Sequence, residues 1–219
     1  MIHLSGVALA RGAKQLLADA ELRIHAGERV GVIGQNGCGK STLFALLRGE
    51  LTPDAGQASV PADWRIAAME QEVVGTDRRA IDFVLDGDTE FRALEAGMES
   101  AGGEQLGEIH ARFAALDGYR AAARAHELLD GLGFATGERE RTVREFSGGW
   151  RLRLALARTL MCPSDLMLLD EPTNHLDLDA LVWLEAWLAR YPGTLILISH
   201  DRDFLDNVCN RIVAFEGGT

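Results

Sequence analysis

The segment that most constrains the fold of this chain is a glycine-rich run at residues 34–42, with the sequence GQNGCGKST. It follows a short apolar stretch and opens a stretch of helical periodicity, so the pattern G-x-x-x-x-G-K-[ST] stands in a strand–loop–helix context. Such a loop turns its backbone N–H groups around a phosphate at a helix N-terminus. We expect Lys40 to reach the β- and γ-phosphate oxygens and Ser41 to bind Mg²⁺. The other expected nucleotide-binding residues are Gly34, Asn36, Gly37, Cys38, Gly39 and Thr42.

Short apolar runs alternate with helical patterns along the chain, at residues 29–33, 166–169 and 194–199. This alternation predicts an α/β core built on a mostly parallel sheet. Four further runs, at 2–9, 22–25, 57–60 and 65–69, predict an additional antiparallel β layer. We expect one nucleotide-binding domain over residues 1–219, with its core at 1–71 and 163–219 and a helical part at 72–162.

No strand pattern is found between residues 72 and 145, where apolar residues recur at helical spacing. Two long helices are expected on either side of Gly102 and Gly103, and a third that ends at Gly133. The sequence therefore predicts a helical hairpin that projects from the core.

Composition excludes several classes of function. The formal charge is −11 and the sequence pI is about 5.0, which disfavours general nucleic-acid binding because that depends on clustered Lys and Arg. No run reaches the roughly 18 apolar residues that span a bilayer, and no signal-peptide pattern opens the chain. The three cysteines lack metal-binding spacing. A cytoplasmic protein with free thiols and no membrane partner is expected.

A second motif, at residues 166–172, has the sequence LMLLDEP. The apolar run predicts a buried strand that ends at two adjacent acids. Asp170 suits a position just outside the direct ligands of Mg²⁺, and Glu171 suits the general base that polarises the attacking water. Two acids at a strand end are also common as a helix cap, so the motif gains its weight from the phosphate loop upstream.

A third motif, FSGGW at residues 146–150, resembles the signature motif of ATP-binding cassettes, because it opens an apolar helical stretch just before the acidic strand. Ser147, Gly148 and Gly149 would form a second anion site at a helix N-terminus. The resemblance implies that these residues contact the γ-phosphate held by an opposing cassette.

Three further segments match the cassette pattern. The run PTNHLD at 172–177 resembles the D-loop, which implies a nucleotide-contacting role for Asp177. The run SHDRDFLD at 199–206 resembles the histidine switch, which implies that His200 binds the γ-phosphate. Gln71 matches the glutamine that senses Mg²⁺ and the attacking water, although glutamine is also common on surfaces.

Together, TNHLD, SHDRDFLD and a signature that ends in Trp resemble the ABC-F family over the whole chain, and within it the YheS-like bacterial branch. The resemblance implies an ATPase with ATP and Mg²⁺ that needs a second cassette, on the same polypeptide or from a homodimer. It also implies action on the ribosome, with rRNA or tRNA as partners, and the hairpin at 81–132 would correspond to the family's arm. Because the chain stops directly after an apparent strand, at residues 216–219, we expect it to be one cassette of a longer protein.

Two residues depart from the pattern. No aromatic side chain lies at residues 10–14, where cassettes stack adenine, so Arg11 is the candidate for guanidinium stacking. Cys38 places a thiol at a helix N-terminus, and a small residue tolerated for packing explains it better than redox control.

Two alternative functions remain. The ATPase subunit of a membrane transporter fits less well because of the long insert after Gln71 and the residues around His200. A chromosome or repair clamp would need coiled-coil heptads over hundreds of residues, and the sequence contains none.

Overall fold

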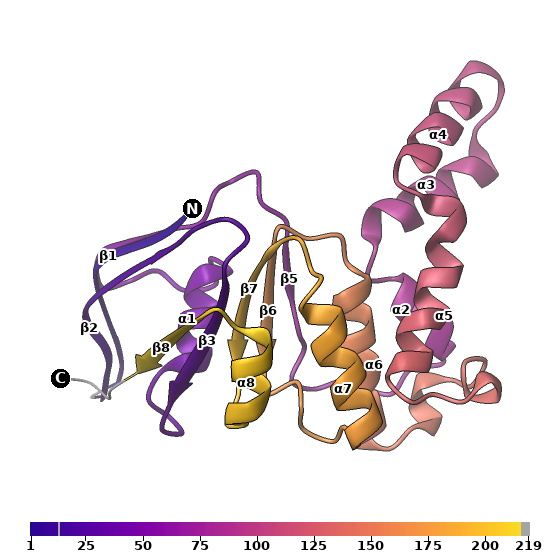
Figure 1. Ribbon diagram of the computed structural model, residues 1–219. Coiled ribbons are helices and arrows are strands. Elements are labelled where there is room, and N and C mark those ends of the chain that lie inside the picture. Colours follow the sequence, from indigo (N-terminus) through magenta and orange to yellow (C-terminus); the bar gives the residue numbers. More distant parts are fainter. Residues whose placement is uncertain (13, 216–219) are drawn as a thin grey trace. The chain divides into compact units, whose positions relative to one another are not determined.

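The computed structural model describes residues 1–12 and 14–215, and its elements are labelled in Figure 1. It divides into two compact units. Unit 1 contains residues 1–69, 164–173 and those from 185 onward, and unit 2 contains residues 70–163 and 174–184. Ala13 and residues 216–219, which the sequence analysis placed in the adenine-binding segment and at the end of a cassette, lie outside the described residues.

Unit 1 is built on a five-stranded sheet in the order β5-β6-β7-β3-β8. Its strands are β3 (Arg29–Gly34), β5 (Ile66–Ala68), β6 (Leu166–Asp170), β7 (Thr194–Ile198) and β8 (Arg211–Phe215). Every neighbouring pair is parallel. All of β7 and nearly all of β6 are buried, as expected for a sheet covered on both faces. The predicted parallel α/β core is confirmed.

One strand was assigned to the wrong sheet. Residues 65–69 were expected in the antiparallel layer, whereas β5 pairs parallel with β6, with Ile66 opposite Leu166 and Ala68 opposite Leu168. The three residues of β5 show no alternation of polar and apolar side chains, so their sequence does not indicate whether the strand pairs parallel or antiparallel. The direction depends on β6, about a hundred residues later in the chain.

A second sheet in unit 1 is antiparallel and has the order β2-β1-β4, with β1 (Ile2–Arg11), β2 (Lys14–Ile24) and β4 (Ala55–Ser59). The second strand was expected only at 22–25, but it begins at Lys14. Its burial does not alternate regularly, and Asp19 has a left-handed φ of 52°, so register shifts hide the strand from a period-two pattern.

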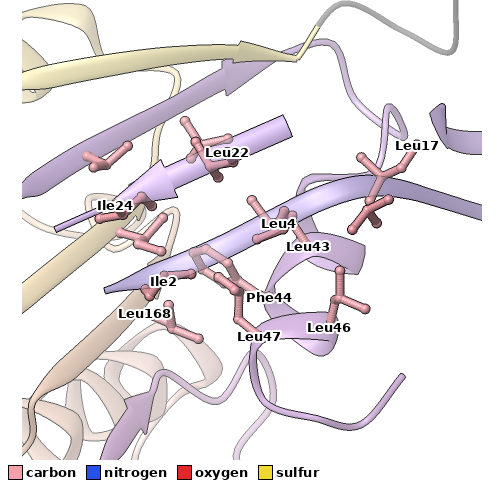
Figure 2. Packing of buried hydrophobic residues seen from close by; sticks show 14 of the residues in the cluster. Ile2, Leu4, Leu17, Leu22, Ile24, Leu43, Phe44, Leu46, Leu47 and Leu168 are labelled. Carbon is pink, nitrogen blue, oxygen red and sulfur yellow. The ribbon is translucent and has the colours of Figure 1, made fainter. Parts of the chain in front are cut away.

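The core of unit 1 gathers side chains from both sheets and from helix α1 (Lys40–Leu47). Figure 2 shows Ile2 and Leu4 of β1 beside Leu43 and Phe44 of α1, with Leu168 of β6 close by. Because α1 begins directly after the glycine-rich loop, its burial in this core fixes the position of that loop.

Unit 2 is helical. Its elements are α2 (Ala80–Leu85), α3 (Thr89–Ser100), α4 (Gly103–Ala115), α5 (Ala121–Gly131), α6 (Gly148–Met161) and the first part of α7 (Leu178–Leu188), with short 3₁₀ turns at Gly118–Arg120, Thr136–Glu138 and Val143–Glu145. The first expected long helix is in fact two. Asp88, 1% exposed, ends the linker between α2 and α3 and accepts a hydrogen bond from Phe91 N at 3.0 Å as the cap of α3.

The predicted hairpin is present as α3 and α4 (Figure 1). The reversal falls where expected, because Gly102 is the N-cap of α4 and Gly103 has a φ of 62°. Phe91 and Phe113 pack across the two helices with ring centroids 5.5 Å apart. Among the described residues, no helix is long and apolar enough to cross a bilayer.

Candidate functional site

Three neighbouring strands of unit 1 bring the predicted catalytic motifs to one edge of the sheet. Strands β6, β7 and β3 are adjacent and parallel, so the segments that follow them leave the sheet at the same edge. These segments carry Asp170 and Glu171, His200, and the glycine-rich loop, respectively. The carboxyl edge of such a sheet is where ligands bind in open α/β folds.

The glycine-rich loop adopts a conformation that requires its glycines. Gly37 and Gly39 have φ values of 72° and 115°, and Gly39 is the N-cap of α1. The Lys40 ammonium donates hydrogen bonds to the backbone oxygens of Gly34 at 2.7 Å and Gln35 at 3.1 Å. The lysine is therefore folded back over the loop, with its charge held at the helix N-terminus.

A second lysine, which the sequence analysis did not assign to the site, also contacts this loop. Lys14 Nζ donates to the Gly37 backbone oxygen at 2.8 Å. Lys14 is the first residue of β2 and pairs with Arg11 across the hairpin, and no sequence motif marks this position. Arg11 itself is exposed, and its role toward adenine stays a prediction.

A pair of oxygen ligands lies beside the loop. The Ser41 hydroxyl donates to Asp170 Oδ2 at 3.0 Å. A hydroxyl and a carboxylate in contact, next to a phosphate-binding loop, are the donor set that Mg²⁺ accepts when phosphates and water complete its octahedral shell. The residues present therefore fit the predicted cation.

Glu171 is in a strained and partly buried environment. Its φ is 50°, which is unusual for a residue with a Cβ, and its side chain is 22% exposed. Burial raises the pKa of the Glu171 carboxyl, although the nearby His200 opposes the shift. A carboxyl with a raised pKa is suited to accept a proton from water.

His200 connects Glu171 to the glycine-rich loop. Its Nε2 lies 3.0 Å from Asn36 Oδ1 and 3.4 Å from Glu171 Oε1, and its backbone N–H donates to Glu171 Oε2 at 3.4 Å. Of the two side-chain contacts of His200, only the one to Asn36 is a hydrogen bond. Glu171 Oε1 is buried and has no hydrogen-bond partner among the described residues. Glu171, His200 and Asn36 thus form one polar chain.

A cleft of about 440 Å³ opens beside His200. Arg202, two residues after His200 and the first residue of α8 (Arg202–Val208), also lines it and adds a cation to which the sequence analysis gave no role. The lining residues are Ile33, Gly34, Gln35, Ser199, His200, Arg202, Ala214 and Phe215.

The signature residues, Gln71 and Asp177 belong to unit 2. Ser147 is the N-cap of α6, but its side chain makes no capping hydrogen bond. Ser147 and Gly148 are exposed, so the first turn of α6 is open to a ligand. Gln71 is exposed, in the irregular segment that precedes α2.

Asp177 uses both of its carboxylate oxygens inside unit 2. Oδ1 accepts from Ala180 N at 3.0 Å at the start of α7, and Oδ2 accepts from Arg153 Nη1 at 2.8 Å. These two bonds, the first of them the stronger influence, lower the pKa of the Asp177 carboxyl. Its carboxylate is therefore engaged within the protein.

Comparison with known proteins agrees with this geometry. The family model described as "ABC transporter" matches residues 17–174, which include the glycine-rich loop, the signature motif and the acid pair. The chain belongs to the ATP-binding cassette family and, within it, to the ABC-F branch.

The similar relatives point to that branch. The chain is 50% identical over 220 residues to "Probable ATP-binding protein YheS" of Escherichia coli, which covers 99% of the chain and 34% of the relative. It is 43% identical to "ABC transporter F family member 4" of Arabidopsis thaliana, covering 93% of the chain and 30% of the relative. The chain thus spans about a third of the length of these relatives. An archaeal ribosome recycling factor, solved in complex with a ribosomal stalk protein, has the same fold at a TM-score of 0.72 and 24% identity, with coverage of 99% of this chain and 37% of that one.

Proposed function

We propose that unit 1 binds Mg-ATP and hydrolyses the bond between its β- and γ-phosphates, which yields ADP and phosphate. The observation that carries this proposal is the convergence of Lys40, the Ser41–Asp170 pair, Glu171 and His200 at one edge of the parallel sheet. The family to which the chain belongs supports it as well.

ATP binding begins with the exchange of contacts at Lys40. The ammonium that now bonds to Gly34 and Gln35 carbonyls turns to the β- and γ-phosphate oxygens, while the N–H groups of the loop and of α1 surround the phosphates. Bound Mg²⁺, held by the Ser41 hydroxyl and the Asp170 carboxylate, supplies neutralisation of phosphate charge.

Hydrolysis depends on the polar chain behind the phosphate. Glu171 accepts the proton of the attacking water, a task for which its raised pKa suits it. His200 binds a γ-phosphate oxygen and Gln71 orients the water. The hydrogen bond between His200 and Asn36 holds the imidazole toward the glycine-rich loop.

A second cassette completes the proposed site. Ser147 and Gly148 are exposed and Gly149 is half-buried at the start of a 14-residue helix, whose N-terminus is suited to bind the γ-phosphate of a nucleotide held by the partner. Because the Asp177 carboxylate is already bonded to Arg153 and Ala180, we propose that it acts by fixing the D-loop.

We further propose that the longer protein acts on the ribosome, because of its ABC-F membership. The helical insert, residues 72–132, argues against ribosome binding through unpaired arginines. Its six arginines all have acidic partners within unit 2; they are Arg78, Arg79, Arg92, Arg112, Arg120 and Arg124. Docking through the arm would then rest on shape and polar contacts more than on free cations.

The alternative is the ATPase subunit of a transporter. It draws support from the description of the matching family and from the same fold in the structure titled "Structure of ATP binding subunit of ABC transporter", with a TM-score of 0.74 at 18% identity. Identity of 50% to YheS over the whole chain favours the ABC-F function.

Two measurements test the proposal. Wild-type protein should bind a fluorescent ATP analogue and hydrolyse ATP, and the 219-residue chain should show a specific activity that rises with protein concentration. High activity independent of concentration would exclude the need for a second cassette.

The ribosomal role is tested with the full-length protein carrying Glu171→Gln, which should bind ATP without turnover. This variant should sediment with ribosomes in ATP, and a Lys40→Ala control should not. Replacing α3 and α4, residues 89–115, by a short loop preserves α2, α5 and α6, which pack together. If neither form sediments, or if the replacement changes nothing, the ribosomal role of the arm is wrong.

A further inference from the structure

Arg153 is a buried arginine whose guanidinium donates hydrogen bonds to two other segments of unit 2. It lies on α6, six residues after Ser147, and is 9% exposed. Its Nε donates to the His175 backbone oxygen at 2.7 Å, and its Nη1 donates to Asp177 Oδ2 at 2.8 Å and to the Leu132 backbone oxygen at 3.2 Å. A buried charge that is paired and hydrogen-bonded in this way is held in one geometry.

The loop that Arg153 holds does not have a relaxed backbone. His175 has a φ of 70°, which costs a residue with a Cβ on the order of 1 kcal/mol or more unless its surroundings impose it. The bond from Arg153 to the His175 oxygen is one such constraint. The capping of α7 by Asp177, whose other oxygen binds Arg153, is the second.

The same loop rests on the first turn of the signature helix. A Cβ at Gly149 would lie 3.3 Å from His175 Cγ, so the second glycine of the signature leaves room for the imidazole. The ring of Trp150, the next residue along α6, has its centroid 4.5 Å from the Arg153 guanidinium carbon. The position of the loop is therefore determined by α6.

We propose that Arg153 is a positioning residue that fixes residues 174–177 of the D-loop to the helix whose N-terminus binds the partner's phosphate. A displacement of α6 on phosphate binding then moves the D-loop with it. This inference rests on the proposed function, because it adds a residue that acts on the closed, hydrolysing state through others and does not touch nucleotide.

The test compares Arg153→Met, which keeps the length of the side chain, with Arg153→Lys in the full-length protein. The methionine variant should bind the ATP analogue in unit 1 with unchanged affinity and lose about 10- to 100-fold in kcat, the size of effect that small misplacements produce. Lysine can still bond to Asp177 but cannot form the fork to the His175 oxygen, so it should restore part of kcat with KM unchanged.

Arg139→Met is the matched control. Arg139 is 8% exposed, belongs to unit 2 and pairs with Asp130 and His126, but it does not touch the D-loop. Both methionine variants should lower the melting temperature, and only Arg153→Met should lose turnover out of proportion. Amide exchange at 174–177 should quicken in Arg153→Met alone.

Each outcome has one meaning. Equal loss of kcat in the two methionine variants, or no rescue by lysine, would overturn the positioning role and leave Arg153 as a stability residue. Full turnover in Arg153→Met would overturn it too. Wild-type protein that neither binds nor hydrolyses ATP would instead overturn the proposed function.

Discussion

Glu171→Gln should stabilise the folded protein at neutral pH while it abolishes hydrolysis. Glu171 Oε1 is buried and accepts no hydrogen bond from the described residues, and burial raises the pKa of the carboxyl. The folded state therefore holds an ionised group that would be better solvated in the unfolded chain. The amide keeps the shape of the side chain and carries no charge.

The expected gain follows from these contacts. A buried acceptor without a partner costs about 1–3 kcal/mol, and the attraction of His200, 3.4 Å away, offsets part of that cost. A gain of about 1 kcal/mol in the free energy of unfolding is expected, or roughly 2–4 °C in melting temperature for a domain of this size. The left-handed φ of Glu171 is unaffected, so its strain stays in both proteins.

The pH dependence of the stability gain in Glu171→Gln shows whether the gain comes from removal of a buried charge. Because the folded pKa lies above the unfolded value, wild-type protein loses stability as the pH rises through the folded pKa, and Glu171→Gln has no such loss. The gain should therefore be absent near pH 4 and complete at higher pH. Urea unfolding of the nucleotide-free chain between pH 4 and 9 measures it.

Glu108→Gln, an exposed acid on α4, is the control and should change the free energy of unfolding by less than about 0.5 kcal/mol. A Glu171→Gln variant no more stable than wild type at pH 8, or a gain that does not vary with pH, would show that burial of the charge is not what raises the pKa.

Two further changes test unit 2. Burial acts to raise the pKa of Asp82 and of Asp86, but hydrogen bonds from arginines outweigh it and lower both pKa values. Their stabilising effect is present above the unfolded pKa and is lost as the pH falls through the folded values. Arg92→Met removes hydrogen bonds to both acids and should lower the free energy of unfolding by about 1–2 kcal/mol at pH 7, and by less below pH 4. Urea unfolding at both pH values measures this difference. An equal loss at both pH values would count against the ion pairs as its cause. Gly131→Ala would place a Cβ in overlap with the Trp183 indole ring, so it should cost about 1–3 kcal/mol in thermal unfolding. In a Trp183→Ala background the same change should be neutral, and a persistent cost would mean that the indole is not the obstacle.

The convergence of the predicted catalytic motifs at one edge of unit 1 could be predicted because these motifs follow strands directly in sequence. Asp170 and Glu171 end an apolar run, and His200 follows another. Once three such strands are parallel and adjacent, their ends must meet. Lys14 could not be found in this way, because its bond to the Gly37 oxygen depends on how a hairpin lies over the loop.

Arg153 was equally hidden from the sequence. Its three bonding partners lie 21 to 24 residues away, on either side of it in the chain. Nothing in the sequence distinguishes Arg153 from an arginine on a solvated helix face. The helix break before α3 could have been predicted, since Asp is a common N-cap residue and Asp88 caps α3. It was missed because the apolar residues keep helical spacing across the break.

The number of arginines in the helical insert does not show how many of them are available to bind phosphate. Residues 72–132 contain thirteen acidic residues and six arginines, and each arginine has an acid within 4 Å. A paired guanidinium must give up its carboxylate before it can bind a phosphate, so the gain in each such contact is reduced. Every free cation placed on a phosphate steepens the salt dependence of binding to duplex nucleic acid by about 0.9 in the logarithmic slope. Ribosome association through an insert of this kind should therefore depend only weakly on salt, and a steep dependence would locate the contacts on another part of the longer protein.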